Sequence, residues 1–228
     1  MPHAAAVVLA GGSGTRLGAE GNKVYLPLAG RPLLAWALEA FARAESVRRL
    51  VLVARPEDRS PARAAADAVP HPVEVVDGGS TRHGSEWAAL RRLAPAIRSG
   101  DIDVVAIHDG ARPVLPVQLI EDIVAAARTH GAVVPGLPLT GVAAPDETGR
   151  LRPVEGTLVR VQTPQAFRAD LLLAAYEQAE RDGFAGTDTA ACVERYAGIP
   201  VHCIPGDPRN IKVTYRPDLV LAERLLRP

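Results

Sequence analysis

The feature that most constrains the fold of this chain is a regular alternation between short apolar runs and stretches with helical spacing. Four apolar runs typical of buried strands occupy residues 4–10, 50–54, 73–76 and 103–107. Four stretches with one apolar face follow them, at residues 33–41, 61–68, 85–93 and 119–127. This alternation predicts a parallel sheet with helices on both faces, so the expected fold class is α/β.

The alternation stops after residue 134. Residues 135–165 have no helical period and contain five prolines and four glycines, which is too long and too interrupted for an ordinary loop. We therefore expect residues 136–161 to form a hairpin arm that leaves the body of a single domain, residues 1–228. Beyond the arm, the pattern predicts helices at 169–181, 188–196 and 217–226, and strands at 199–204 and 211–214.

Charge and composition exclude several classes of protein. Lys plus Arg and Asp plus Glu both number 26, so a chain that coats nucleic acid or an anionic membrane is not expected. No apolar run approaches the roughly 20 residues of a membrane span, and the N-terminus lacks the basic segment of a signal peptide. Cys192 and Cys203 are the two cysteines, and their spacing suggests neither a zinc site nor a disulfide scaffold. We expect a cytoplasmic protein.

The loop after the first predicted strand is rich in glycine and is followed by two cations. It reads AGGSGTR over residues 10–16, and Lys23 lies seven residues beyond Arg16. Consecutive amides in such a loop can form an anion-binding nest, and the two cations would complete a cradle for a triphosphate. The loop is not a Walker A motif, because no GK[ST] follows. An ordinary strand-to-helix turn would explain the glycines but not the two cations.

Other candidate residues have a structural reading beside a functional one. Asp109 ends a strand and could bind Mg²⁺ or a hydroxyl group, or serve as a turn or capping residue. Arg112 could bind a phosphate or form a surface ion pair. Ser85, three residues after Arg82 at a helix start, could contact a ligand or cap the helix. Lys212, taken alone, would be a solvated surface residue.

Taken together, the motifs resemble a known family. They are the loop at 10–16, GGSTRHGS at 78–85, HDGARP at 108–113, QTPQAF at 162–167 and NIKVT at 210–214. The loop is similar to that of the sugar-nucleotide pyrophosphorylases and nucleotidyltransferases. The order and spacing of the whole set resemble the cytidylyltransferases that act on 2-C-methyl-D-erythritol 4-phosphate, and the related enzymes that act on ribitol 5-phosphate. The resemblance covers essentially the whole chain.

The resemblance implies a Rossmann-like nucleotidyltransferase domain with a mostly parallel sheet and a projecting β-arm. It implies that CTP and a small alcohol phosphate are joined with Mg²⁺ as cofactor and pyrophosphate as product, in a homodimer formed through the arm. The implied catalytic residues are Arg16 and Lys23. The implied nucleotide-binding residues are Ala10, Gly11, Gly12, Ser13, Gly14, Gly79, Ser80, Arg82, Ser85 and Gly110. The implied acceptor-binding residues are Asp109, Arg112, Thr163 and Lys212, with Asp109 also a candidate metal ligand.

The arm departs from the family pattern. Where the family has an acid, a hydroxyl and a cation, this chain has Gly141, Val142 and Ala144, and Glu155 stands where the family presents an arginine to the neighbouring subunit. Arg152 or Arg160 could replace that arginine after a shift in register. We expect the nucleotide half to be intact and methylerythritol phosphate, the first-choice acceptor, to bind more weakly.

Three alternatives remain open at this stage. Ribitol 5-phosphate or a phosphonate could be the acceptor, or the chain could be a non-catalytic nucleotide-binding paralogue. A guanylyltransferase of the molybdenum-cofactor type is disfavoured by the segments at 78–85 and 210–214.

Overall fold

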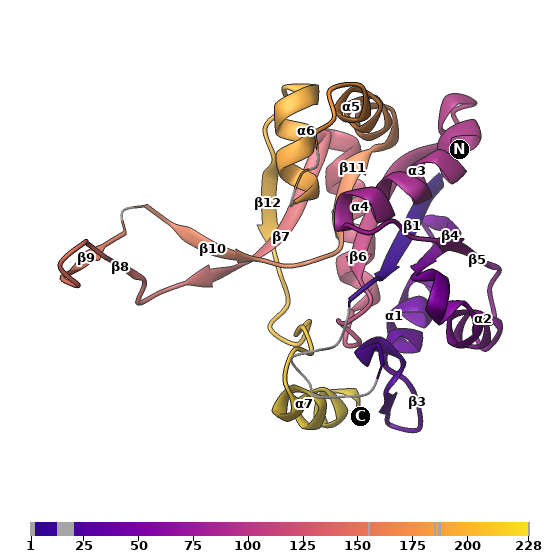
Figure 1. The fold of residues 1–228 in the computed structure, drawn as a ribbon, viewed down its shortest axis with the longest axis horizontal. Helices are drawn as coiled ribbons and strands as arrows, with labels where there is room; N and C mark the ends of the chain where they lie inside the picture. The colour runs from indigo at the N-terminus through magenta and orange to yellow at the C-terminus, as the bar shows by residue number, and fades with distance from the viewer. Residues whose placement is uncertain (1–2, 13–20, 155, 185, 187, 228) are drawn as a thin grey trace.

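A single twisted sheet forms the centre of the protein. The computed structural model describes residues 3–12, 21–154, 156–184, 186 and 188–227. Within these ranges the sheet has eight strands, in the order β10-β7-β11-β6-β1-β4-β5, with β12 paired to β7 (Figure 1). Their bounds are β1 His3–Ala10, β4 Val47–Ala54, β5 Val73–Asp77, β6 Ile102–Asp109, β7 Ala132–Leu139, β10 Leu158–Val161, β11 Gln165–Arg168 and β12 His202–Pro205. Strands β6, β1, β4 and β5 run parallel, whereas β11 is antiparallel to β6 and β7. The predicted α/β fold with a mostly parallel sheet is confirmed.

Helices cover both faces of the sheet because its strands are apolar on both sides. Alternate residues of β1 enter different cores: Ala6 and Val8 pack on one face, Ala5 and Val7 on the other. The first face is covered by α1 Leu33–Ala42, α2 Arg59–Asp67 and α4 Val117–His130. The second face is covered by α3 Arg82–Arg98, α5 Ala169–Arg181 and α6 Thr189–Ala197. None of the described helices is long and apolar enough to cross a membrane.

A third, smaller core lies below the carboxyl ends of the parallel strands. There α7, Arg216–Leu226, packs near the hairpin of β2 Pro27–Leu28 and β3 Arg31–Pro32 (Figure 1). The strand predicted at 211–214 is wrong. Val213 is buried in this core and its amide donates to the Ala111 carbonyl, but the segment joins no strand ladder. The strand predicted at 199–204 is present but begins later, at His202.

The arm leaves the body on the side of β7 and β10 (Figure 1). Strand β7 extends beyond the body with β10 antiparallel to it, and the tip is a hairpin of β8 Ala143–Pro145 and β9 Leu151–Pro153. Every residue of both tip strands is exposed. The projecting arm of the predicted fold is thus confirmed.

Candidate active site

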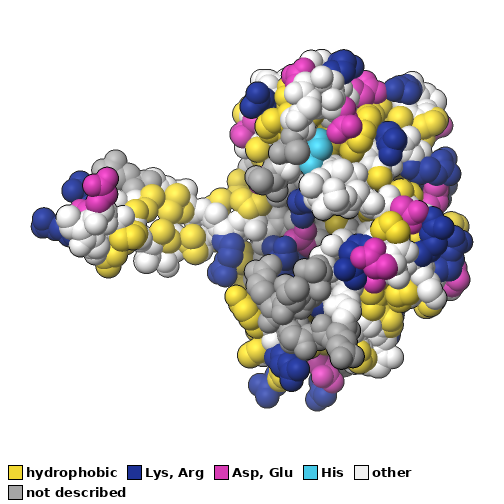
Figure 2. All heavy atoms as spheres, in the orientation of Figure 1, with side chains coloured by type: hydrophobic (Ala, Val, Ile, Leu, Met, Phe, Trp, Pro, Cys, Tyr) yellow, Lys and Arg dark blue, Asp and Glu magenta, His cyan; other side chains and the backbone are white. Residues whose placement is uncertain are grey.

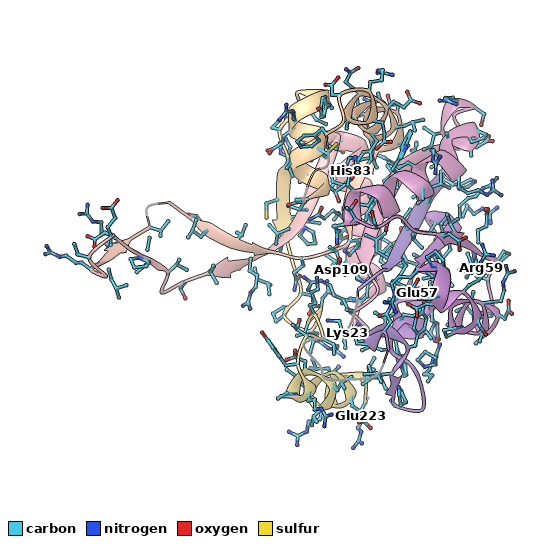
Figure 3. The ribbon with its side chains drawn as sticks, in the orientation of Figure 1. Lys23, Glu57, Arg59, His83, Asp109 and Glu223 are labelled. Atoms are coloured by element: carbon cyan, nitrogen blue, oxygen red, sulfur yellow. The ribbon has the colours of Figure 1, made fainter. Side chains whose placement is uncertain are left out.

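The carboxyl ends of three parallel strands bring the sequence motifs into one cavity. Strands β1, β5 and β6 end at Ala10, Asp77 and Asp109, so the segments that follow them meet at one edge of the sheet. The cavity there has a volume of about 270 Å³. It is lined by Leu9, Gly11, Gly12, Lys23, Val24, Gly79, Ser80, Thr81, Arg82, Ser85, Asp109, Gly110, Ala111 and Lys212. Figure 3 shows Lys23 and Asp109 near one another at this edge.

Two glycines of the cavity are required by close backbone packing. A Cβ on Gly110 would lie 2.9 Å from the Leu9 carbonyl oxygen, and a Cβ on Gly79 would lie 2.9 Å from the carbonyl carbon of Gly84. Any larger residue would push the β6 end away from β1, or the 78–85 turn away from the start of α3. The glycines therefore keep the cavity walls close together.

Asp109 lies among three cations. Its Oδ1 accepts a hydrogen bond of 2.7 Å from Arg82, and its Oδ2 accepts one of 2.8 Å from Lys212. The Nε of Arg112 lies 3.8 Å from the same Oδ2. Burial by itself would raise the pKa of Asp109, but the charges and hydrogen bonds of Arg82 and Lys212 outweigh it and hold that pKa well below its usual range. With Lys23 also at the cavity wall, cations exceed carboxylates, which suits the site to a polyanion.

A buried acid behind the cavity orients Arg82. Glu86, one turn further along α3, is almost completely buried, and its Oε1 lies 2.9 Å from the Arg82 Nε. The same oxygen accepts a hydrogen bond of 2.7 Å from Thr189, and the other oxygen accepts one from the Tyr176 hydroxyl. Burial raises the pKa of Glu86, while Arg82 and the two hydroxyls oppose the rise. The Arg82 guanidinium is thus held at two points, by Glu86 and Asp109.

Asn22 fixes the position of Lys23. Its side-chain amide donates to the Ala10 carbonyl, at the end of β1, and to Asp58 at 2.9 Å. Its side-chain oxygen caps the short 3-10 helix η2, Lys23–Tyr25, by accepting from the Val24 amide. Asp58 is held in turn by Arg55 through two hydrogen bonds. Lys23 is therefore buried against the cavity at a fixed distance from the start of the glycine-rich loop.

Thr163 supports the site from behind the cavity. Its hydroxyl accepts a hydrogen bond of 3.0 Å from the Asp109 amide and lies 3.1 Å from the Nδ1 of His108. Thr163 is thus bonded to the backbone that presents Asp109, and it does not line the cavity. Arg112 donates to the Asn210 carbonyl at 2.8 Å and lines a second, adjacent cavity that also contains Lys212.

Several predicted site residues differ in role or lie outside the description. Ala10 is buried and contributes its carbonyl to Asn22. Thr81 caps α3, and the Ser85 hydroxyl donates to the Thr81 carbonyl at 2.9 Å. Ser13, Gly14, Arg16 and Glu155 lie outside the described residues.

Sequence reasoning missed Asn22 and Glu86. The position of Asn22 directly before Lys23 is a helix-capping signal that could have revealed it. Glu86 gave no signal, because its partners are 90 and 103 residues away in the chain.

Comparison with known proteins places the chain in one family. The family model described as IspD, 2-C-methyl-D-erythritol 4-phosphate cytidylyltransferase, matches residues 4–228. The enzyme of that name from Cereibacter sphaeroides is 42% identical over 227 residues, covering 97% of this chain and 96% of the relative. The one from Geobacillus kaustophilus is 40% identical over 228 residues, covering 97% and 96%.

Two solved structures agree with this result. The 4-diphosphocytidyl-2C-methyl-D-erythritol synthase of Anaerococcus prevotii superimposes with a TM-score of 0.85 at 26% identity, covering 100% of this chain and 97% of that one. The Thermus thermophilus 2-C-methyl-D-erythritol 4-phosphate cytidylyltransferase gives 0.72 at 30% identity, covering 97% and 98%. The chain therefore belongs to the 2-C-methyl-D-erythritol 4-phosphate cytidylyltransferase family, and it is a nucleotidyltransferase.

Proposed function

We propose that this protein joins the CMP part of CTP to 2-C-methyl-D-erythritol 4-phosphate and releases pyrophosphate, a step of isoprenoid biosynthesis. Membership of the family supports this reaction over the alternatives of ribitol 5-phosphate, a phosphonate acceptor or a non-catalytic paralogue. The observation that carries the proposal is one cavity bordered by Gly11, Gly12 and Gly79, into which Lys23, Arg82 and Lys212 bring positive charge.

The nucleotide is assigned to the wall formed by the ends of β1 and β5. The backbone amides of Gly11 and Gly12 are assigned to the triphosphate, because amides bind phosphate oxygens. Ser13 and Gly14, which lie outside the described residues, are assigned to it from the sequence. The turn at Gly79 and Ser80, with Arg82, Ser85 and Gly110, surrounds the nucleoside. Asp109 and Lys212 lie between this part of the site and the part assigned to the acceptor, which Arg112 also lines. Thr163 supports that part through its hydrogen bond with the Asp109 amide.

The reaction needs no protein nucleophile. An oxygen of the acceptor phosphate attacks the α-phosphorus of CTP and forms a new P–O bond. The bond from the α-phosphorus to the bridging oxygen breaks, and its electron pair leaves with pyrophosphate. The attacking oxygen is already ionised, so no proton must move. Lys23 and Arg16 are assigned to stabilise the charge that develops on the α-phosphate and the leaving group, a contribution of about a hundredfold or more in rate for one well-placed donor.

Magnesium is expected to be bound mainly by the triphosphate. The described residues contain no cluster of three side chains able to hold a metal ion, and both oxygens of Asp109 accept hydrogen bonds from cations. Asp109 thus offers at most a shared oxygen to a metal. When bound, Mg²⁺ would neutralise phosphate charge during transfer.

The arm supports assembly as a homodimer. Six of its apolar side chains are exposed, and Figure 2 shows apolar side chains along the arm. They are Leu139, Val142, Leu151, Val154, Val159 and Val161. A contiguous exposed apolar surface on a protruding hairpin is typical of a protein–protein contact, and a second copy of the arm is its expected partner.

The test is a turnover assay on the purified protein with Mg²⁺, scored by pyrophosphate release and by phosphorus NMR of the product. CTP with methylerythritol phosphate should give the diphosphate-linked product, while ATP, GTP and UTP should give little. Lys23→Ala and Arg16→Ala should each lower kcat by about a hundredfold or more. Arg43→Ala, which removes an exposed partner of Glu39, is the matched control and should leave kcat unchanged. Equal turnover with all four nucleotides, or normal turnover of Lys23→Ala, would refute the proposal.

A further inference from the structure

A second cavity adjoins the nucleotide cavity at the root of the arm. Lys212 lines both cavities, and Arg112 and Arg160 line the second one. In Figure 2 basic side chains gather where the arm joins the body. Three cations from three different segments of the same protomer, β10, the end of β6 and the segment before α7, therefore surround one space.

Arg160 is placed there by fixed structure at the root of the arm. In the β7–β10 ladder it stands opposite Leu137, which lines the same cavity. Two residues later, Gln162 donates to the carbonyls of Asp207 and Asn210, at 2.8 and 3.1 Å. The Asn210 carbonyl is also the acceptor for Arg112. The strand end that carries Arg160 is thus fastened to the same loop as Arg112.

The charges around this cavity are unbalanced. Asp218 is the acid in its lining, and its Oδ2 accepts two backbone hydrogen bonds, from Thr214 and Tyr215. Within the described ranges, no ion pair joins Arg160 to an acid, and the buried Nε of Arg112 has no hydrogen-bond partner. Burial lowers the pKa of Arg112. The charge of Asp109 opposes this shift, while the nearby charges of Arg160 and Arg82 add to it. Guanidinium groups held close together in this way are suited to an anion with several oxygens.

Arg152, which the sequence also suggested as a replacement for the missing arginine, has a different environment. It lies in the tip strand β9, and its Nε is 3.3 Å from Asp146 of the same hairpin. Its side chain is largely exposed. Arg152 is therefore occupied within the tip, whereas Arg160 faces the body of its own protomer.

We propose that Arg160 is a positioning residue for the acceptor, binding its phosphate together with Arg112 and Lys212 of the same protomer. This inference rests on the proposed function. It supplies the acceptor phosphate with a cation from the arm although the family's arginine position is occupied by Glu155 in this chain. Since Lys212 stands between the two cavities, a phosphate bound by these cations has one oxygen directed toward the nucleotide. The acceptor is held by its phosphate, so the effect of Arg160 should fall on acceptor binding and not on CTP.

The main experiment compares Arg160→Gln with the wild-type enzyme in steady-state kinetics. We expect the KM for methylerythritol phosphate to rise about tenfold to a hundredfold, as for the loss of one hydrogen bond to a charged group. The KM for CTP should be unchanged, and Arg160→Lys should recover part of the acceptor affinity. Arg152→Gln is the matched control and should behave like wild type. An acceptor KM within about twofold of wild type for Arg160→Gln would overturn the inference.

A second experiment tests whether Arg160 acts within its own protomer. Differently tagged Arg160→Gln and Lys23→Ala subunits are co-expressed, and the doubly tagged dimer is purified. Activity is measured at an acceptor concentration well below the wild-type KM, where a weakened acceptor site limits the rate. If both residues serve the same protomer's site, neither site is complete and activity stays low. Recovery to about half of wild type would show that Arg160 acts across the dimer and would overturn the assignment. If the chain is a monomer, the kinetics above decide alone.

The two proposals fail in different ways. A wild-type protein that makes no product from CTP and methylerythritol phosphate refutes the proposed function, and with it this inference. A wild-type protein that turns over normally, with Arg160→Gln equal to it, refutes the inference and leaves the proposed function intact.

Discussion

The buried histidine beside Asp109 should make the stability of this protein depend on pH. His108 is completely buried in β6, and its Nε2 lies 3.2 Å from the Arg112 carbonyl. A carbonyl only accepts, so Nε2 carries the hydrogen, and Nδ1 is left to accept from the Thr163 hydroxyl. Because that hydroxyl also accepts from the Asp109 amide, the neutral ring completes a closed set of hydrogen bonds. A second proton would place a positive charge on this completely buried ring.

The size of the effect follows from the pKa. Burial lowers the pKa of His108 from 6.5 to about 4. The unfolded chain therefore binds a proton at a pH where the folded chain does not, so the contribution to stability is present above about pH 6.5 and is lost as the pH falls toward 4. Between about pH 7 and about pH 5, the free energy of unfolding should fall by about 2 kcal/mol on account of this residue.

Urea unfolding at several pH values measures this loss. The matched variants are His108→Gln, whose amide can replace both hydrogen bonds, and His202→Gln, which removes an exposed histidine. We expect His108→Gln to lose about 2 kcal/mol less than wild type over the same pH range, and His202→Gln to follow wild type. His83, whose pKa burial also lowers, is present in all three proteins and cancels in the comparison. Parallel pH profiles for wild type and His108→Gln would refute the reasoning.

Two further predictions follow from the site and the arm. Asn22→Ala removes the contacts that hold Lys23 against β1 and leaves Asp58 without one of its donors. We therefore expect kcat to fall about tenfold and the free energy of unfolding to fall by about 1–3 kcal/mol. A normal kcat in a folded variant would contradict the role given to Asn22. Leu151→Glu places a charge on the exposed face of the arm tip. If the arm forms the proposed dimer, light scattering should report a dimer for wild type and a monomer for the variant, with the melting of the body little changed. A variant that is as dimeric as wild type would remove the arm from the interface.

The parallel sheet and the site edge could be predicted from sequence because both depend on local patterns. Apolar runs that end in glycine or aspartate mark the carboxyl ends of parallel strands, and parallel strands bring those ends together. The sequence therefore placed Lys23, Gly79 and Asp109 in one site, and the cavity they line agrees. For the same reason, the helices were predicted correctly in kind, with errors mainly at their ends.

What depends on distant partners could not be predicted. Residues 211–214 have the apolar and polar alternation of a strand. The reason for the pattern is that Ile211 and Val213 pack in the small core with α7, and the segment pairs with none of the described strands. Glu86 has the appearance of an exposed helical charge, and only the packing of α5 and α6 on α3 shows that it is buried. Arg152 and Arg160 could not be told apart, because their difference lies in the pairing register of β10 with β7.

In most of the chain a residue must be compatible both with the folding of the body and with function, whereas residues at the tip of the arm are largely free of the first requirement. Its tip strands, Ala143–Pro145 and Leu151–Pro153, pair with each other and contribute no side chain to the three cores of the body. A change in the tip therefore costs the sheet little, and mutations that would be lost elsewhere for misfolding can persist there. Changes in these two strands can therefore alter the surface that the arm presents while the catalytic body keeps its fold. The hairpin tip is thus a part of this enzyme whose sequence can change with little effect on the folding of the body.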